Sequence, residues 1–203
     1  MSESEKHAII ILAAGESSRM GEPKQLLQLD GKSLLRHAVE EAVGADIGPV
    51  IVVLGAFSDQ IVQELHGLPI VKVINSDWQQ GMGTSIRKGV LEVQKNHNTC
   101  QGAVIMLSDQ PFANANLLKK LLKIFYSSKK PIVASAYKGI LGVPAYFHHL
   151  CFVSLTQLEG PIGARKFIQQ HAKEVEAVPF PLGAVDIDTP EDYARLKEKI
   201  KGK

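Results

Sequence analysis

The 203-residue chain has few cysteines, no long apolar run and no excess of charge of one sign. Its two cysteines, Cys100 and Cys151, are far apart and form no C-x-x-C pair, so neither a disulfide framework nor a cysteine-based zinc site is expected. No apolar stretch is long enough to span a bilayer, and the first apolar run is too short for a signal peptide. The formal net charge is only +2, without a long basic stripe, which argues against nucleic acid as a partner. We therefore expect a cytoplasmic protein that uses neither a membrane nor a nucleic acid.

The common phosphate-binding and nucleophile motifs are also missing. The first glycine-containing loop has a G-x5-G spacing with no Gly-Lys-Ser/Thr after it, and it contains no G-x-G-x-x-G. No Ser/His/Asp or Cys/His constellation suggests a covalent nucleophile, and the seven histidines show no metal-ligand spacing. These absences disfavour Walker-type and dinucleotide-binding proteins.

Apolar runs alternate with amphipathic segments along most of the chain. The runs predict strands at 8–12, 50–54, 69–74, 102–107 and 131–136. The amphipathic segments predict helices at 33–43, 58–65, 84–94 and 116–125. After residue 136 the pattern weakens to a strand-like segment broken by Gly142 and Pro144, a helix within 160–172, a strand near 174–180 and a helix capped by Thr189. Because the strands are apolar on both faces, we predict an α/β fold, a single-domain Rossmann-like three-layer sandwich with a mostly parallel central sheet.

The segment 8–24, AIIILAAGESSRMGEPK, turns from an apolar strand directly into small and polar residues. Ala13, Ala14 and Gly15 carry so little side chain that successive backbone N–H groups there can surround an anion. Arg19 and Lys24 add fixed positive charge close by. The segment therefore predicts a phosphate-binding loop, the alternative being a surface connection with solvated charges.

Polar residues follow several other predicted strands. Ligands of open parallel sheets bind outside the carboxyl ends of the strands, so the first loop, the 75–85 loop, Asp109 and the acidic pair Asp186 and Asp188 should converge. Carboxylates from two strand ends, completed by water and phosphate oxygens, suit Mg²⁺. Each aspartate has the alternative of capping a turn or a helix, and the sequence leaves open which of the acidic pair would bind the metal.

The glycine-containing stretch 81–85 and the single tryptophan, Trp78, lie in this polar region. We predict that 81–85 is a loop that contacts a base or ribose, because it follows a polar segment rather than a strand. Trp78 is interpreted either as a packing anchor or as a ligand contact.

Four motifs together resemble one family. The first, LAAGESSRMGEPK, is similar to the signature loop of the GT-A-type nucleotidyltransferases, within which the match is to the small molybdenum cofactor cytidylyltransferase and guanylyltransferase group. The segments 81–85 (GMGTS), 108–111 (SDQP) and 186–192 (DIDTPED) extend the resemblance over nearly the whole chain. The resemblance implies one nucleotidyltransferase domain over 1–203, with 7–110 binding the nucleotide and 111–203 binding the acceptor and completing the metal site.

The resemblance also implies residue roles. An acceptor phosphate would attack the α-phosphate of a nucleoside triphosphate, and pyrophosphate would leave. Arg19, Lys24 and Asp109 would be the catalytic residues, and Asp109 with Asp188 would hold Mg²⁺. The nucleotide-binding residues would be Leu12, Ala13, Ala14, Gly15, Arg19, Lys24, Gly81, Met82 and Ser85.

Substrate choice depends on smaller differences. Guanylyl-transferring relatives resemble LAGG at the loop, whereas 12–15 is Leu-Ala-Ala-Gly, as in the cytidylyl-transferring ones, so CTP is expected. The acceptor would be a molybdopterin-type compound bound by Gly142, Pro144 and Arg165, with a molybdoenzyme as a candidate client. The chain departs from the family's Gly-His-Pro and Gly-Asp-x-Gly-Ala-Arg at 142–144 and 160–165, which leaves the acceptor open. The alternatives are a sugar- or alditol-phosphate nucleotidyltransferase, a GTP-using guanylyltransferase, and a nucleotide-binding protein that delivers the cofactor without transferring anything.

Overall fold

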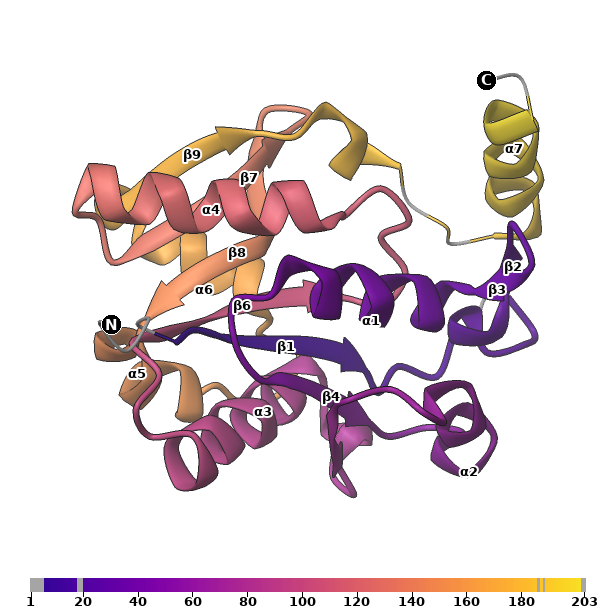
Figure 1. Cartoon of the computed structure of the whole chain (residues 1–203), viewed down its shortest axis with the longest axis horizontal. Helices are drawn as coiled ribbons and strands as arrows, with labels where there is room; N and C mark the ends of the chain where they lie inside the picture. The colour runs from indigo at the N-terminus through magenta and orange to yellow at the C-terminus, as the bar shows by residue number, and fades with distance from the viewer. Residues whose placement is uncertain (1–5, 18–19, 186, 188, 202–203) are drawn as a thin grey trace.

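The computed structural model describes residues 6–17, 20–185, 187 and 189–201. It has a seven-stranded sheet and a short two-stranded one, with helices packed on both faces of the larger sheet (Figure 1). The strands are β1 Ala8–Ala13, β2 Gln28–Leu29, β3 Lys32–Ser33, β4 Val50–Leu54, β5 Val71–Ile74, β6 Gly102–Leu107, β7 Ile132–Tyr137, β8 Ile140–His148 and β9 Val175–Pro179. The α-helices are α1 Leu34–Ala45, α2 Ser58–Ile61, α3 Met82–Asn96, α4 Ala115–Ser128, α5 Phe152–Thr156, α6 Ala164–Gln170 and α7 Pro190–Lys201. Short 3-10 turns are η1 Lys24–Leu26, η2 Val62–Leu65, η3 Trp78–Gln80, η4 His149–Cys151, η5 Ala172–Glu174 and η6 Pro181–Ala184.

The large sheet is mostly parallel, in the order β5-β4-β1-β6-β8-β7-β9. Strand β1 pairs in parallel with both β4 and β6, and only β8 runs antiparallel to its two neighbours. The predicted α/β fold with a mostly parallel central sheet is therefore confirmed.

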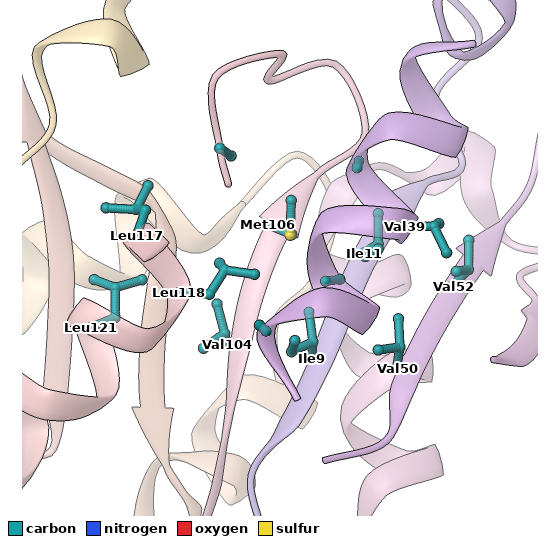
Figure 2. Close-up of a cluster of buried hydrophobic side chains, with 14 of the residues drawn as sticks. Ile9, Ile11, Val39, Val50, Val52, Val104, Met106, Leu117, Leu118 and Leu121 are labelled. Carbon is teal, nitrogen blue, oxygen red and sulfur yellow. The ribbon is translucent and has the colours of Figure 1, made fainter. Parts of the chain in front are cut away.

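Alternate residues of each central strand face opposite helical layers. Ile9 and Ile11 of β1 point to the layer of α1 and α4, where they belong to one buried cluster with Val39 and Leu118 (Figure 2). Ile10 faces the layer of α3, α5 and α6 instead. All five side chains are fully buried, and burying one such side chain contributes about 1.5–3 kcal/mol. Burial on both faces explains why the strand sequences are continuously apolar.

The chain changes direction across the sheet beside β1. From β1 it passes through α1 to β4 and on to β5, and α3 then returns it to β6 on the other side of β1. A crevice outside the carboxyl ends of the strands is expected where the strand order reverses in this way. That position is the edge formed by the ends of β1 and β6.

Two predicted boundaries were wrong in informative ways. Helix α3 begins at Met82, two residues before the predicted start, so the stretch predicted as a loop is a helix N-cap, Gly81, followed by the first helical turn. Strand β8 is one nine-residue strand, and its register against β7 shifts where the break was predicted, with Val143 and Pro144 forming the irregular part. Tertiary pairing on both sides of β8 outweighs the weak local signal.

The predicted helix caps are confirmed. The Ser33 hydroxyl accepts the backbone N–H of Arg36 at the start of α1. At α7, Thr189 and Asp192 accept each other's backbone N–H groups, which is a capping box. Helix α7 packs on the β2–β3 hairpin, where Leu196 and Leu29 share a small buried cluster (Figure 1). Among the described residues, none of the helices is long and apolar enough to cross a membrane.

Candidate active site

A cavity of about 350 Å³ opens at the edge where β1 and β6 end. Three predicted elements form its walls: the loop after β1, the segment from η3 into α3, and the turn after β6. The lining residues are Leu12, Ala13, Ala14, Gly15, Glu16, Ser17, Lys24, Gln25, Trp78, Gln79, Gly81, Met82, Ser85, Leu107, Ser108 and Asp109.

The loop after β1 is held from behind by a buried glutamine. The Gln25 side-chain amide donates to the carbonyl oxygens of Ala13 (3.1 Å) and Gly15 (3.0 Å). Its oxygen accepts the Ser17 hydroxyl at 3.3 Å, and that hydroxyl also accepts the backbone N–H of Lys24. The loop is therefore tied at both ends to the short turn that carries the lysine.

The wall between β5 and α3 has its own buried amide. Asn75 is fully buried, and its side-chain nitrogen donates to the hydroxyl oxygens of Thr84 and Ser85, both at 2.9 Å. Its side-chain oxygen accepts the backbone N–H of Asp77. The Ser85 oxygen accepts from Asn75, and Ser85 also lines the cavity, where its hydroxyl group can serve as a donor.

Glycines let this wall pack closely on the segment before α6. A Cβ atom at Gly81, whose φ is 112°, would lie 2.3 Å from the carbonyl oxygen of Gly160. A Cβ atom at Gly83 would lie 3.0 Å from the carbonyl oxygen of Leu158. The N-terminus of α3 and the 158–162 segment therefore support each other through direct backbone contact.

Replacing Gly81 by alanine should destabilise this contact strongly. The added methyl group would require both a rare backbone conformation and displacement of Gly160, so we expect a loss of about 2 kcal/mol or more in the free energy of unfolding. Chemical denaturation measures it. Gly44→Ala is the matched control, because Gly44 lies in α1 with no atom near its Cβ position, and it should be neutral or stabilising by up to about 1 kcal/mol. Equal stability of both variants would contradict the proposed close packing.

Opposite charges meet at the mouth of the cavity. The Lys24 Nζ atom lies 3.9 Å from the Asp109 Oδ2 atom, with side-chain exposures of 12% and 31%. The turn that carries Asp109 is anchored by Gln110, which accepts the backbone N–H of Leu107 and donates to the carbonyl oxygen of Val143. This separation is too long for a direct hydrogen bond, so the two groups form an ion pair, and both line the cavity in which a ligand would bind.

The charge of the lining requires a further cation for a triphosphate ligand. Among the described lining residues, the one cation, Lys24, is outnumbered by two carboxylates, Glu16 and Asp109. A triphosphate would add several negative charges to this set. Arg19 and a divalent metal ion, both predicted from the sequence, are the groups that would neutralise these negative charges.

The structure places most of the predicted nucleotide-binding residues on one cavity. Eight of the nine line it, from Leu12 to Gly15, with Lys24, Gly81, Met82 and Ser85. The ninth, Arg19, and the predicted acidic pair Asp186 and Asp188 lie outside the described residues.

The three predicted acceptor residues are not part of the cavity lining. Gly142 and Pro144 are buried in β8, where a Cβ at Gly142 would meet the Tyr137 hydroxyl at 2.4 Å and the Pro144 carbonyl accepts the Ser135 hydroxyl. Arg165 is exposed in the first turn of α6. Their role in acceptor binding stays a prediction.

Several lining residues were not predicted. Ser17 and Ser108 lie within the first and third motifs but were given no role, and Gln25 directly follows the predicted Lys24 without belonging to a motif. Trp78 packs on Gly55, where its Cβ lies 2.7 Å from the position of a Cβ at that glycine, and it also lines the cavity, so contact with a ligand stays a prediction.

Neither cysteine is suited to act as a nucleophile. Burial raises the pKa of the Cys100 thiol, and burial together with Glu174 raises the pKa of the Cys151 thiol to about 11. Neither residue lines this cavity.

Comparison with known proteins identifies the family of the chain. Residues 9–175 match the MobA-like NTP transferase domain. The chain belongs to the MobA-like NTP transferase family. The chain is 30% identical to the purine catabolism protein PucB of Bacillus subtilis strain 168, covering 94% of this chain and 96% of that protein. It is 28% identical to nicotine blue oxidoreductase of Paenarthrobacter nicotinovorans, over 92% of this chain and 94% of that protein. Molybdenum cofactor cytidylyltransferase of Escherichia coli K12 is 25% identical over 94% and 95% of the two chains.

Solved structures of two similar proteins have the same fold. The homologue of Mycobacterium tuberculosis Rv0371c from Mycobacterium sp. strain JC1 superposes with a TM-score of 0.80 at 30% identity, covering 96% of each chain. The manganese complex of Rv0371c from M. tuberculosis H37Rv superposes with a TM-score of 0.78 at 25% identity, covering 95% of this chain and 98% of that chain.

The residues present fit a metal bound jointly with a nucleotide. In the part of the chain that the structure describes, no three His, Cys, Asp or Glu side chains are grouped to hold a metal ion by themselves. Nucleotide enzymes commonly bind Mg²⁺ through one or two carboxylates, with phosphate and water oxygens completing the shell. Asp109, partly exposed at the cavity mouth, is suited to be one of those carboxylates.

Proposed function

We propose that the protein is a Mg²⁺-dependent cytidylyltransferase, which transfers CMP from CTP to the phosphate of a molybdopterin-type cofactor and releases pyrophosphate. The observation that carries the proposal is the Lys24–Asp109 pair, 3.9 Å apart at the mouth of a cavity whose other wall is a loop of small residues. In this arrangement the cation can bind a phosphate oxygen while the carboxylate binds the metal ion that accompanies the phosphate.

Each described residue has a defined task in this reaction. The small-residue loop binds the phosphates through backbone N–H groups, and Lys24 neutralises the charge that develops on the α-phosphate. Asp109 holds the metal, which supplies charge neutralisation of the phosphates when bound. The acceptor phosphate is the nucleophile, so the protein contributes positioning and charge stabilisation.

The sequence of the loop after β1 supports CTP. Residues 12–15 are Leu-Ala-Ala-Gly, which resembles the cytidylyl-transferring members of the family, whereas the guanylyl-transferring members resemble LAGG. The relative from E. coli K12 is named a molybdenum cofactor cytidylyltransferase, which supports the same substrate pair.

The competing functions differ in the substrates that they predict. Purified protein with Mg²⁺ is offered CTP, GTP or ATP, each with molybdopterin, a sugar phosphate or an alditol phosphate, and pyrophosphate release is measured. We expect release with CTP and molybdopterin, at a rate at least about tenfold above GTP or ATP. Release only with a sugar or alditol phosphate would show that the proposed acceptor is wrong, and release only with GTP would show that the proposed nucleotide is wrong. CTP binding without release under any condition would instead indicate a delivery protein.

A further inference from the structure

The Gln25 carboxamide is buried beside the cavity, and the proposed chemistry assigns it no task. The residue is only 3% exposed, yet it lines the cavity that we assign to the nucleotide. Both of its N–H donors are used on loop carbonyl groups, those of Ala13 and Gly15, and its oxygen receives the Ser17 hydroxyl. A buried side chain that satisfies all its hydrogen-bonding groups on one loop fixes the orientation of that loop's peptide planes.

The orientation of the carbonyl groups determines where the neighbouring donors point. The peptide groups after Ala13 and after Gly15 are trans, so their N–H groups, which belong to Ala14 and Glu16, point opposite to the carbonyls held by Gln25. Ala14 and Glu16 both line the cavity. Among the described residues, no carbonyl oxygen accepts a hydrogen bond from the N–H groups of Ala14, Gly15 or Glu16.

We propose that Gln25 is the positioning residue of the nucleotide loop, which aims the N–H groups of Ala14 and Glu16 at the phosphate oxygens of the bound nucleotide. The inference rests on the proposed nucleotide site. Gln25 acts through the loop, by its hydrogen bonds to the carbonyl oxygens of Ala13 and Gly15. Without its amide the two peptide planes are free to rotate. The N–H groups of Ala14 and Glu16, which together we call the anion cradle, then lose their preorganised orientation.

Two substitutions test this role. Gln25→Glu keeps the size and the acceptor oxygen but loses both donors, and Gln25→Leu removes all polar groups at similar size. Gln28→Ala is the matched control, because Gln28 is an exposed glutamine that donates only to the nearby Leu26 carbonyl.

Binding is followed through Trp78, the only tryptophan in the chain, which lines the same cavity. The ligands are CTP and inorganic tripolyphosphate, the second of which probes the anion cradle without a base. We expect the Kd for both ligands to rise about tenfold or more in the Gln25 variants and to stay within about twofold in Gln28→Ala. In turnover, the KM for the nucleotide should rise while the KM for the acceptor is unchanged, a split that a general loss of folded protein would not produce.

Nuclear magnetic resonance of the wild-type protein gives a test that does not depend on the variants folding. On addition of tripolyphosphate, the amide resonances of Ala14 and Glu16 should shift and become protected from exchange. Folded Gln25 variants that bind both ligands as tightly as wild type, or Ala14 and Glu16 amides that do not respond, would overturn the positioning role while leaving the proposed function intact. A wild-type chain that binds neither ligand would overturn both.

Discussion

Replacing Lys24 by methionine should lower kcat by about a hundredfold or more, because one group that stabilises developing charge typically contributes that much. Methionine keeps most of the length and apolar surface of the lysine but removes the positive charge. The lysine side chain is 12% exposed and lies in a cavity that also contains two carboxylates, so little solvent and no other described lining cation can replace it. Steady-state pyrophosphate release measures the change.

A surface lysine provides the control for this prediction. Lys32 is about half exposed and pairs with Glu40 on the outside of α1. Lys32→Met removes the same charge outside the cavity and should change kcat less than about twofold, as expected for an exposed ion pair. If Lys24→Met also retained near-wild-type turnover, the assignment of Lys24 to the α-phosphate would be wrong.

Replacing Asp109 by asparagine should lower turnover to a similar extent, about a hundredfold or more, and should change its metal dependence. Asparagine preserves the shape of the side chain and the contacts of Gln110 that fix the turn, but it loses the negative charge that a divalent cation requires. The Mg²⁺ concentration at half-maximal rate should therefore rise about tenfold or more.

The control for this prediction is Asp59→Asn, at an exposed position in the short helix α2 outside the cavity lining. It should leave both turnover and the Mg²⁺ dependence unchanged. A loss of turnover in Asp109→Asn with an unaltered Mg²⁺ dependence would show that Asp109 acts through its pairing with Lys24 and does not hold the metal.

The parts of the fold that could be predicted are those with a strong local signal. Strands β1, β4 and β6 are buried on both faces, so their apolar runs are continuous, and α1 and α7 begin at side chains that cap their first turns. The meeting of Lys24 with Asp109 followed from one topological rule, since both come after parallel strands that end at the same edge.

The features that the sequence did not reveal depend on contacts between distant segments. The start of α3 was misplaced because Gly81 and Gly83 resemble loop residues, whereas their small size accommodates the backbone of 158–162. The insertion of β8 between β6 and β7 depends on pairing with both strands, and no local sequence pattern indicates that pairing.

Gln25 shows the same limitation at the site. Its sequence context does not indicate that it is buried. Its hydrogen-bond partners, Gly15 and Ala13, lie 10 and 12 positions upstream and come close to it only in the folded loop. The acceptor side is the least determined part, since two of its predicted residues are buried in β8 and the third is exposed on α6.

The central claim is that this cavity binds a nucleoside triphosphate together with a metal at Asp109. A crystal structure with a CTP analogue that cannot be cleaved between the α- and β-phosphates, grown with Mn²⁺ and recorded at the manganese absorption edge, tests it directly. The account predicts the triphosphate along the loop after β1, its α-phosphate at Lys24, and an anomalous peak beside Asp109. A nucleotide bound elsewhere, or a manganese peak away from Asp109, would contradict it.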